Sequence, residues 1–395
     1  KQDRAFMTRL VDGTIEYMLQ LDYIIDSFSK TKVRKMKPFI RNLLRMSVYQ
    51  IKYMDAVPDS AVCNEAVKLA KRHKFAQLSG FVNGVLRNIA RNIDSVQFDT
   101  LSIRYSMPQW IVDRFVAAYG EKKAEEIFKA FHSKSTISIR TNLTRCTPDE
   151  LRATLEAEGV TVTAVDELNY AFVISGFDYL NGLQSFRDGL FYVQDISSML
   201  VAQTAAPKKG DYVIDVCAAP GGKSTHIAEL LQGSGHVLAR DLTDNKVDMI
   251  EENIERHGLN NMSAEVWDAT VPDADSAGKA DILICDLPCS GLGVLGRKKD
   301  IRYKMTPESV DELAALQRQI LDTVHTYVKP NGVLVYSTCT IDEAENEDNV
   351  RWFIEKHPEF ELDKNFAEGT GMKQILPGEH GSDGFFIARF IKSKL

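Results

Sequence analysis

Two cysteines in this sequence stand where a thiol could act as a nucleophile. Cys289 lies in Asp-Leu-Pro-Cys-Ser-Gly, residues 286–291, and Cys339 lies in Ser-Thr-Cys-Thr, residues 337–340. Each motif follows an apolar run that predicts a central strand, so each thiol is expected at or just past a strand end. A free thiol is only a few per cent ionised at neutral pH, yet it is nucleophilic enough to add to an electron-poor ring carbon. Two such thiols suggest covalent catalysis with assisted release.

Residues 213–231 predict a ligand-binding turn. An apolar run and Asp215 lead into Pro220-Gly221-Gly222, and apolar residues at helical spacing follow, a pattern typical of strand, tight turn and helix. The glycines let backbone approach a ligand, and the helix start offers unpaired N–H groups. The spacing fits neither the dinucleotide fingerprint nor the P-loop, so Gly-Lys-Ser at residues 222–224 is not interpreted as an ATP site.

Two acids follow the next predicted strands. Asp241 ends the strand expected over 236–241, where a carboxylate can hold both hydroxyls of a ribose. Asp268 lies near the end of the strand expected over 263–269 and could accept a hydrogen bond from an adenine amine. Each acid alone is more commonly a helix cap or a solvated loop residue, but two at successive strand ends favour a ligand. That ligand is an adenosine without a pyrophosphate.

These motifs belong to a regular alternation of strands and helices. The alternation predicts a doubly wound parallel sheet with its ligands at the carboxyl ends of the strands. Helices are expected over 246–258 and 309–328, further strands over 281–286 and 332–339, and a last strand over 384–392 that could pair antiparallel at the edge.

The front of the chain is helical and basic. Residues 1–95 hold 17 Lys/Arg and 9 Asp/Glu, whereas the remainder holds 31 and 46, so a net charge of −7 conceals a front part of +8. This part could contact a polyanion or could simply be a solvated helical surface. The exposed basic residues are expected to be Lys30, Lys32, Arg34, Lys35 and Lys37 in one loop and Lys71, Arg72 and Lys74 in another.

The middle of the chain predicts a helical stretch over 101–134 and then a small α+β module. Strands are expected over 137–142 and, as a pair, over 160–173, with a helix over 148–159 between them. Gln194, Asp195 and Ser197 could hold a ligand or cap the helix that follows. The predicted domains are therefore 1–97, 98–190 and 191–395.

Composition narrows the class of protein. No apolar run approaches the length of about 20 residues that spans a bilayer, and no signal peptide is visible, so a cytoplasmic protein is expected. Six cysteines without a Cys-x-x-Cys pair favour neither disulfides nor zinc, and eight scattered histidines add no metal-ligand spacing. We expect a monomer without a metal.

The motifs together resemble a known family. DVCAAPGGKS, DLPCSGLGVLGRKKDIRYK, VYSTCTIDEAENEDNV and DGFFIARF resemble the RNA cytosine-5 methyltransferases that use S-adenosylmethionine. Residues 64–91, NEAVKLAKRHKFAQLSGFVNGVLRNIAR, resemble the last part of the RNA-binding domain related to the antitermination factor NusB. The whole chain resembles the bacterial 16S rRNA branch, the RsmB/Sun (Fmu) family of the NOL1/NOP2/NSUN-type superfamily. Its abrupt start predicts that the first helices of the NusB-like domain are missing, and Lys299 departs from a proline found in many relatives.

The resemblance implies a fold and a set of site residues. The fold would be multidomain: an α-helical NusB-like bundle, a small α+β module, and an α/β Rossmann-like methyltransferase domain that uses S-adenosylmethionine. Asp241 would bind the ribose and Asp268 the adenine of the cofactor. Cys339 would be the nucleophile, Cys289 would help the product leave, and Asp286, beside the cofactor, would assist catalysis at N3 and N4 of cytosine. The backbone that cradles the methionine part would be Cys217, Ala218, Ala219, Pro220, Gly221, Gly222 and Lys223.

The implied substrate is 16S rRNA, naked or within a partly assembled small subunit. Alternatives are a tRNA or 23S rRNA methylated by the same mechanism, a non-catalytic ribosome-assembly RNA-binding protein, and a DNA cytosine-5 methyltransferase, in which the cysteine after proline attacks. The basic residues after the Pro-Cys motif are expected to hold phosphates beside the target base or to form a solvated loop. They are Arg297, Lys298, Lys299, Arg302 and Lys304.

Overall fold

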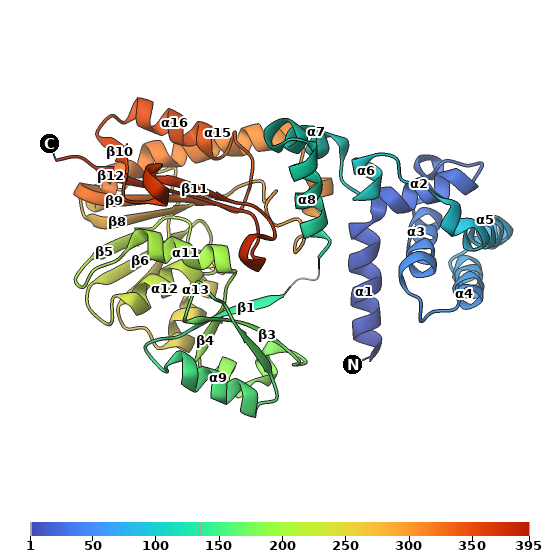
Figure 1. Cartoon of the computed structure of the whole chain (residues 1–395), viewed down its shortest axis with the longest axis horizontal. Helices are drawn as coiled ribbons and strands as arrows, with labels where there is room; N and C mark the ends of the chain where they lie inside the picture. Colours follow the sequence, from blue (N-terminus) through green and yellow to red (C-terminus); the bar gives the residue numbers. More distant parts are fainter. Residues whose placement is uncertain (1, 134–135, 395) are drawn as a thin grey trace. The chain divides into compact units, whose positions relative to one another are not determined.

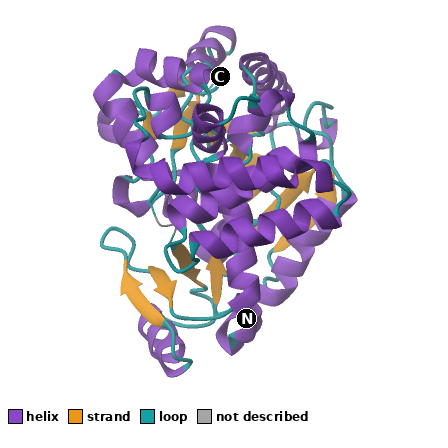
Figure 2. Cartoon of the chain, turned by 90° about the vertical axis from the view of Figure 1, so that its right-hand side faces the viewer, coloured by secondary structure: helices purple, strands orange, loops and turns teal. Residues whose placement is uncertain are grey.

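The computed structural model describes residues 2–133 and 136–394 and divides into two compact units. The first unit contains the chain up to His132 together with Lys298–Lys304, and the second contains Ser133–Arg297 and Met305–Leu395 (Figure 1). Within the described chain, strands (orange in Figure 2) occur only in the second unit. Lys134, where the expected helical stretch 101–134 ends, lies outside the described residues, as do Lys1, Ser135 and Leu395.

The first unit is helical because its apolar residues recur at helical spacing and close on one core. Leu21, Leu44 and Leu86 are fully buried members of that core. The helices are α1 (Gln2–Glu16), α2 (Met18–Phe28), α3 (Pro38–Tyr53), α4 (Asp59–Arg72), α5 (Ser79–Asn92), α6 (Leu101–Arg104), α7 (Gln109–Tyr119) and α8 (Glu121–Phe131), joined by the short α14 (Ile301–Lys304). The basic residues expected in two loops are exposed, but Lys71 and Arg72 lie in the last turn of α4 and only Lys74 follows that helix.

The small module is a four-stranded antiparallel sheet with two helices. Its strand order is β2-β3-β1-β4, so the strand before the glycine-turn region, β4, pairs with β1 of this module. The helix α9 begins with a capping box between Thr147 and Glu150. The elements are β1 (Ile137–Thr141), α9 (Pro148–Ala157), β2 (Thr161–Ala164), β3 (Ala171–Ser175), α10 (Gln184–Arg187) and β4 (Phe191–Val193).

The rest of the second unit is built on a mixed sheet. Its path is β10-β12-β9-β8-β5-β6-β7, with β11 also paired to β12. Neighbouring strands from β9 to β7 are parallel, and β12 is antiparallel to β9. The strands are β5 (Tyr212–Asp215), β6 (His236–Asp241), β7 (Met262–Val266), β8 (Ala280–Asp286), β9 (Val328–Thr338), β10 (Phe360–Leu362), β11 (Met372–Ile375) and β12 (Phe385–Lys392). The expectation that the last strand forms the edge is wrong, because β10 pairs with its outer side.

Helices cover both faces of this sheet (Figure 1). On one face, α15 and α16 bury Leu321 and Phe353 against Leu283 of β8. On the other, α11, α12 and α13 bury Ile227 and Ile250 with Val213. The helices are α11 (Ile196–Ala205), α12 (Gly222–Leu230), α13 (Asp244–His257), α15 (Pro307–Val324) and α16 (Glu347–Lys356). Such double covering explains why the central strands are apolar on both faces.

The predicted multidomain architecture is confirmed: a helical bundle, a small α+β module and an α/β domain with helices on both faces of its sheet follow one another along the chain. Within the described part of the chain, no helix has the length and apolar character needed to cross a membrane.

Candidate active site

The glycine turn connects β5 to α12 as the sequence predicts. Gly221 has a φ of 99°, a left-handed conformation that glycine adopts without strain, and it caps the start of α12. A Cβ atom at Gly222 would lie 3.1 Å from the ring of Tyr192. The fully buried Arg140 of β1 donates to the Gly222 carbonyl at 3.1 Å and pairs with Glu229 of the same helix at 3.0 Å. The α+β module therefore fixes the helix that begins at the turn.

Asp241 at the end of β6 is directly bonded to this turn. Its Oδ2 accepts a hydrogen bond from the Ala219 amide at 2.9 Å, and its Oδ1 accepts from the Leu242 amide at 2.7 Å. Lys246 of α13 also pairs with Oδ1 at 2.8 Å, through a side chain that is 50% exposed and can move away. A buried carboxylate beside a partly buried helix start suits a ribose on one side and the carboxylate of an amino acid on the other. These groups fit an adenosyl cofactor that carries methionine.

Asp286 lies at the end of β8, which is separated from β6 by β5 in the sheet. Its Oδ2 lies 2.6 Å from Nζ of Lys223, and its Oδ1 accepts from the Ser337 hydroxyl at 2.8 Å. Burial lowers the pKa of Lys223, but the charge and hydrogen bond of Asp286 outweigh burial, so the net pKa is raised and the ammonium stays charged. Sequence reasoning assigned Lys223 only to the backbone cradle. Its side chain instead holds the proposed catalytic acid.

The two cysteines meet at the neighbouring strand ends. Cys289, three residues after β8, lies with its Sγ 3.2 Å from Sγ of Cys339, the residue that follows β9. The amide of Gly293 donates to the Cys339 carbonyl at 3.1 Å, which ties the two loops together. All six cysteines lie in the described part of the chain, and none forms a disulfide.

The environment of Cys289 disfavours its thiolate form. The hydrogen bond to Cys339 and then burial raise the pKa of Cys289 well above its usual range, and the charge of Glu345 adds to the effect. A thiol held in its protonated form can donate to the sulfur beside it. The pair is therefore arranged so that Cys289 is the donor whenever Cys339 carries the negative charge.

The other acids predicted for the site make short-range contacts within their own turns. Asp268 is exposed, lies two residues after β7, and accepts from the amide and hydroxyl of Thr270 at 2.8 and 2.7 Å, as a turn-capping acid does. Asp195 caps α11 through the Ser197 amide at 3.0 Å. Cys217 follows β5 by two residues and is partly exposed, whereas Cys285 lies inside β8 and is fully buried.

The basic residues after the Pro-Cys motif do not form one phosphate-binding surface. The expectation is wrong for Arg302, whose fully buried guanidinium lies 3.5 Å from the carbonyls of Glu16 and Ser106 in the helical unit. The others are partly engaged: Arg297 pairs with Asp195 and Asp383, Lys299 with Glu16, and Lys304 with Asp300, while Lys298 is exposed.

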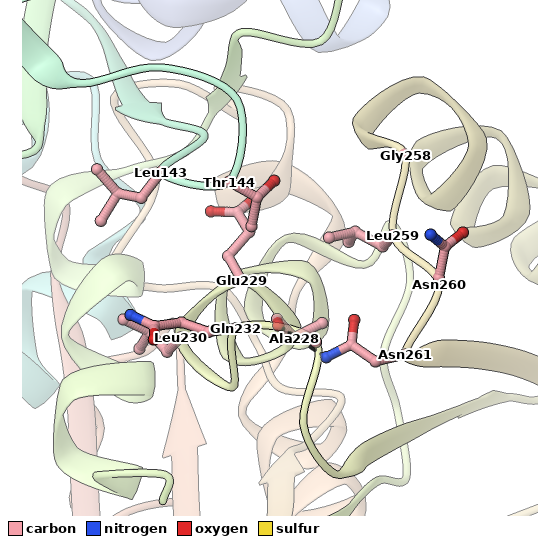
Figure 3. A pocket seen from close by; sticks show the side chains of 11 residues that line it. Leu143, Thr144, Ala228, Glu229, Leu230, Gln232, Gly258, Leu259, Asn260 and Asn261 are labelled. Carbon is pink, nitrogen blue, oxygen red and sulfur yellow. Dashed lines mark hydrogen bonds between the residues drawn. The ribbon is translucent and has the colours of Figure 1, made fainter. Parts of the chain in front are cut away.

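Two other features lie away from the strand ends that carry the cysteines. A cavity of about 410 Å³ is lined by residues at the far end of α12, including Glu229 and Leu230, and by Gly258–Asn261 (Figure 3). Asp322, His325 and His357 have ligand atoms close enough for a metal ion, a grouping that sequence spacing did not reveal. Lys356, however, lies 2.9 Å from the Asp322 carboxylate and supplies a positive charge there. The Asp322 carboxylate is therefore already paired with a positively charged side chain of the protein.

Asp215 at the end of β5 predicts a pH-dependent stability. It is fully buried, and burial, with the charge of Asp286, raises its pKa to about 7 although the Ser224 hydroxyl opposes the shift. Because the folded state binds the proton more tightly than the unfolded chain, this stabilisation is complete below pH 4 and is lost as the pH rises through 7. Asp215→Asn should therefore gain on the order of 3 kcal/mol relative to wild type between pH 4.5 and 8, measured by urea unfolding.

The matched control for this prediction is Asp211→Asn at the other end of the same strand region, which is partly exposed. An equal gain with Asp211→Asn would mean that the effect does not come from the burial of Asp215. A stability difference for Asp215→Asn that stays constant with pH would contradict the raised pKa of Asp215.

Comparison with known protein families places the chain among rRNA-modifying enzymes. Residues 202–391 match the family described as 16S rRNA methyltransferase RsmB/F. Residues 1–91 match the NusB family, and residues 107–177 match the ferredoxin-like domain of RsmF/B-like methyltransferases. The three matches follow one another along the chain in the predicted order.

Individual relatives are similar over nearly the full length. The chain is 38% identical to the probable ribosomal RNA small subunit methyltransferase B of Bacillus subtilis, over 99% of this chain and 91% of that protein. The crystal structure of PH0851 has a TM-score of 0.84 and 26% identity, covering 99% of this chain and 90% of that one. The structure of NSun6 from Pyrococcus horikoshii with SFG has a TM-score of 0.65 and 24% identity over 73% of this chain and 99% of that one, which shows a shared fold.

Proposed function

The chain belongs to the RsmB/F family of 16S rRNA methyltransferases, and from this membership we propose that it methylates carbon 5 of a cytosine in small-subunit (16S) rRNA through a covalent cysteine adduct. Its cofactor, S-adenosylmethionine, supplies when bound a methyl group on a positively charged sulfur, which a carbon nucleophile can attack. The thiol pair carries the proposal, because Sγ of Cys289 lies 3.2 Å from Sγ of Cys339 beside the Lys223–Asp286 ion pair.

Cys339 acts as the nucleophile. Carbon 5 of cytosine is too weakly nucleophilic to take a methyl group at neutral pH. Addition of the Cys339 thiolate to carbon 6 turns the ring into an enamine and makes carbon 5 reactive. Asp286, held by Lys223 and Ser337, assists the addition by hydrogen bonding at N3 and N4 of the base.

Cys289 completes the reaction. After the methyl group is added, the proton on carbon 5 must leave before the bond between Cys339 and carbon 6 can break. Cys289 removes this proton directly or positions the water that does so. Its raised pKa leaves Cys289 protonated while Cys339 attacks, and a thiolate that it forms afterwards is a stronger base than an unperturbed cysteine.

The cofactor and the RNA occupy different parts of the chain in this proposal. The backbone of residues 217–223 cradles the methionine part, Asp241 holds the ribose, and Asp268 contacts the adenine. The exposed lysines and arginines before α3 and at or just after the end of α4 contact rRNA phosphates. The target base must be unpaired or flipped out of a helix to reach Cys339. We place the reaction in the cytoplasm, because rRNA is the proposed substrate, and we expect a monomer.

Product analysis tests the proposed reaction. The enzyme is incubated with methyl-labelled S-adenosylmethionine and, separately, 16S rRNA, 23S rRNA, tRNA or DNA carrying the same cytosines. Nucleosides from each digest are then identified by mass spectrometry. We expect label in 5-methylcytidine from 16S rRNA. Label in another methylated nucleoside would contradict the cytosine-5 assignment, and label mainly in another nucleic acid would contradict the substrate.

A further inference from the structure

A buried carboxylate lies directly behind the two cysteine loops. Glu345 follows Ser-Thr-Cys-Thr by five residues and is fully buried. Burial raises its pKa, while hydrogen bonds from Ser290 and Gln317 act in the opposite direction. A carboxylate in such a place is costly unless its oxygens accept hydrogen bonds, so its partners indicate what it holds.

Its partners are the residues on both sides of Cys289. Oε1 of Glu345 accepts from the Ser290 amide at 2.9 Å and from Nε2 of Gln317 at 2.9 Å, and Oε2 accepts from the Ser290 hydroxyl. Gln317 Nε2 also donates to the Pro288 carbonyl at 2.8 Å. The backbone is therefore fixed immediately before and immediately after Cys289.

The adjacent residue performs the same task for Cys339. Asn346 accepts from the Thr338 hydroxyl at 2.6 Å and donates to the Thr340 carbonyl at 3.1 Å, so it holds both neighbours of Cys339. The Ser290 and Thr340 hydroxyl oxygens lie 2.9 Å apart and join the two loops. Glu345 and Asn346 are consecutive, so the spacing of the two thiols is set by one short backbone segment.

We propose that Glu345 is a positioning residue: it holds the 288–290 backbone so that the Cys289 thiol stays beside Cys339, and it thereby sets the rate at which the covalent adduct is released. This inference rests on the proposed function. In Glu345→Gln one of the two acceptor oxygens becomes an NH2 donor, so the hydrogen bonds from the Ser290 amide, the Ser290 hydroxyl and Gln317 cannot all be kept, and the loop can shift. A proton-transfer group displaced by even about 1 Å loses much of its rate. Release should therefore slow, while attack by Cys339 continues.

The test uses Glu345→Gln, with Glu343→Gln as the matched control. Glu343 undergoes the same change two residues away but is exposed and pairs with Arg351. Each full-length variant is incubated with a 16S rRNA transcript and S-adenosylmethionine. Covalent adduct is measured on denaturing gels, and kcat and KM are determined from methyl transfer. For Glu345→Gln we expect kcat to fall about tenfold, KM for rRNA to stay within about twofold, and adduct to accumulate. Glu343→Gln should match wild type in all three.

A purely structural role would lower the amount of folded enzyme without making adduct accumulate. If Glu345→Gln does not fold, Ser290→Ala decides: it keeps the amide bond to Glu345 and removes only the hydroxyl, so a smaller accumulation of the same kind is expected. Normal release by the folded variant would overturn the inference. Cys289→Ala is run in parallel. If Cys289→Ala forms no adduct, the proposed function is contradicted. If Cys289→Ala forms adduct but Glu345→Gln releases it at the normal rate, only the role of Glu345 is contradicted.

Discussion

Replacement of Cys339 by alanine should abolish methyl transfer to rRNA, lowering kcat by at least about 10⁴-fold. Without addition to carbon 6 of cytosine, carbon 5 stays too weak a nucleophile. The variant loses the hydrogen bond to Cys339 that contributes most to the raised pKa of Cys289, but burial and the charge of Glu345 remain and still disfavour a Cys289 thiolate. The side chain is only half-buried at the end of β9, so the loss of one sulfur should change the free energy of unfolding by no more than about 1 kcal/mol. Methyl transfer to a 16S rRNA transcript measures the effect.

Binding and folding controls distinguish loss of the nucleophile from loss of cofactor binding or of folded enzyme. Calorimetry should give S-adenosylmethionine affinity close to that of wild type, because no proposed cofactor contact involves the Cys339 side chain. Cys146→Ala provides the matched control: it removes a half-buried thiol of the α+β module, where burial raises the pKa to about 11. It should retain wild-type activity. A Cys339→Ala enzyme that keeps more than about one hundredth of the activity would contradict the nucleophile assignment.

The strand ends that carry the site could be predicted because their signals are local. Apolar runs followed by an acid or a cysteine correspond to β5, β6 and β8, and Cys339 follows β9 directly. Parallel strands bring their carboxyl ends to one edge, so the sequence also predicts that these side chains lie near one another.

The partners of these side chains could not be predicted in the same way. Lys223 pairs with Asp286 across 63 positions, and Glu345 bonds to Ser290 across 55. No spacing rule links residues so far apart, and Gly-Lys-Ser, which does not fit a phosphate-binding motif, gives no sign of a carboxylate partner for Lys223. Only the folded sheet shows which donor faces which acid.

The role of the basic residue Arg302 and the position of the last strand in the sheet were predicted least well. Arg302 looks like an RNA contact in the sequence, yet its guanidinium is buried against carbonyls of the helical unit, because a basic residue can serve either purpose. The final strand lies inside the sheet because the short β10 pairs with it, and three residues carry too little periodicity to reveal a strand.

Replacement of Cys289 by alanine should produce the opposite phenotype to Cys339→Ala: a protein–RNA adduct that survives a denaturing gel. Cys339 can still add to carbon 6, and carbon 5 can still take the methyl group. Loss of the carbon 5 proton, however, then lacks the group 3.2 Å from the attacking sulfur. Release should slow by about 10²-fold or more, the usual contribution of a positioned proton-transfer group.

The double variant Cys289→Ala, Cys339→Ala distinguishes the two roles. If Cys339 makes the bond, the adduct seen with Cys289→Ala disappears in the double variant, and added S-adenosylmethionine is needed for the trapped species to carry the methyl label. An adduct that forms with Cys339→Ala instead would move the nucleophile to Cys289 and indicate the mechanism of the DNA cytosine-5 enzymes. The hydrogen bond to Cys339 and burial raise the pKa of Cys289 and disfavour its thiolate while Cys339 is present, so the adduct is expected on Cys339.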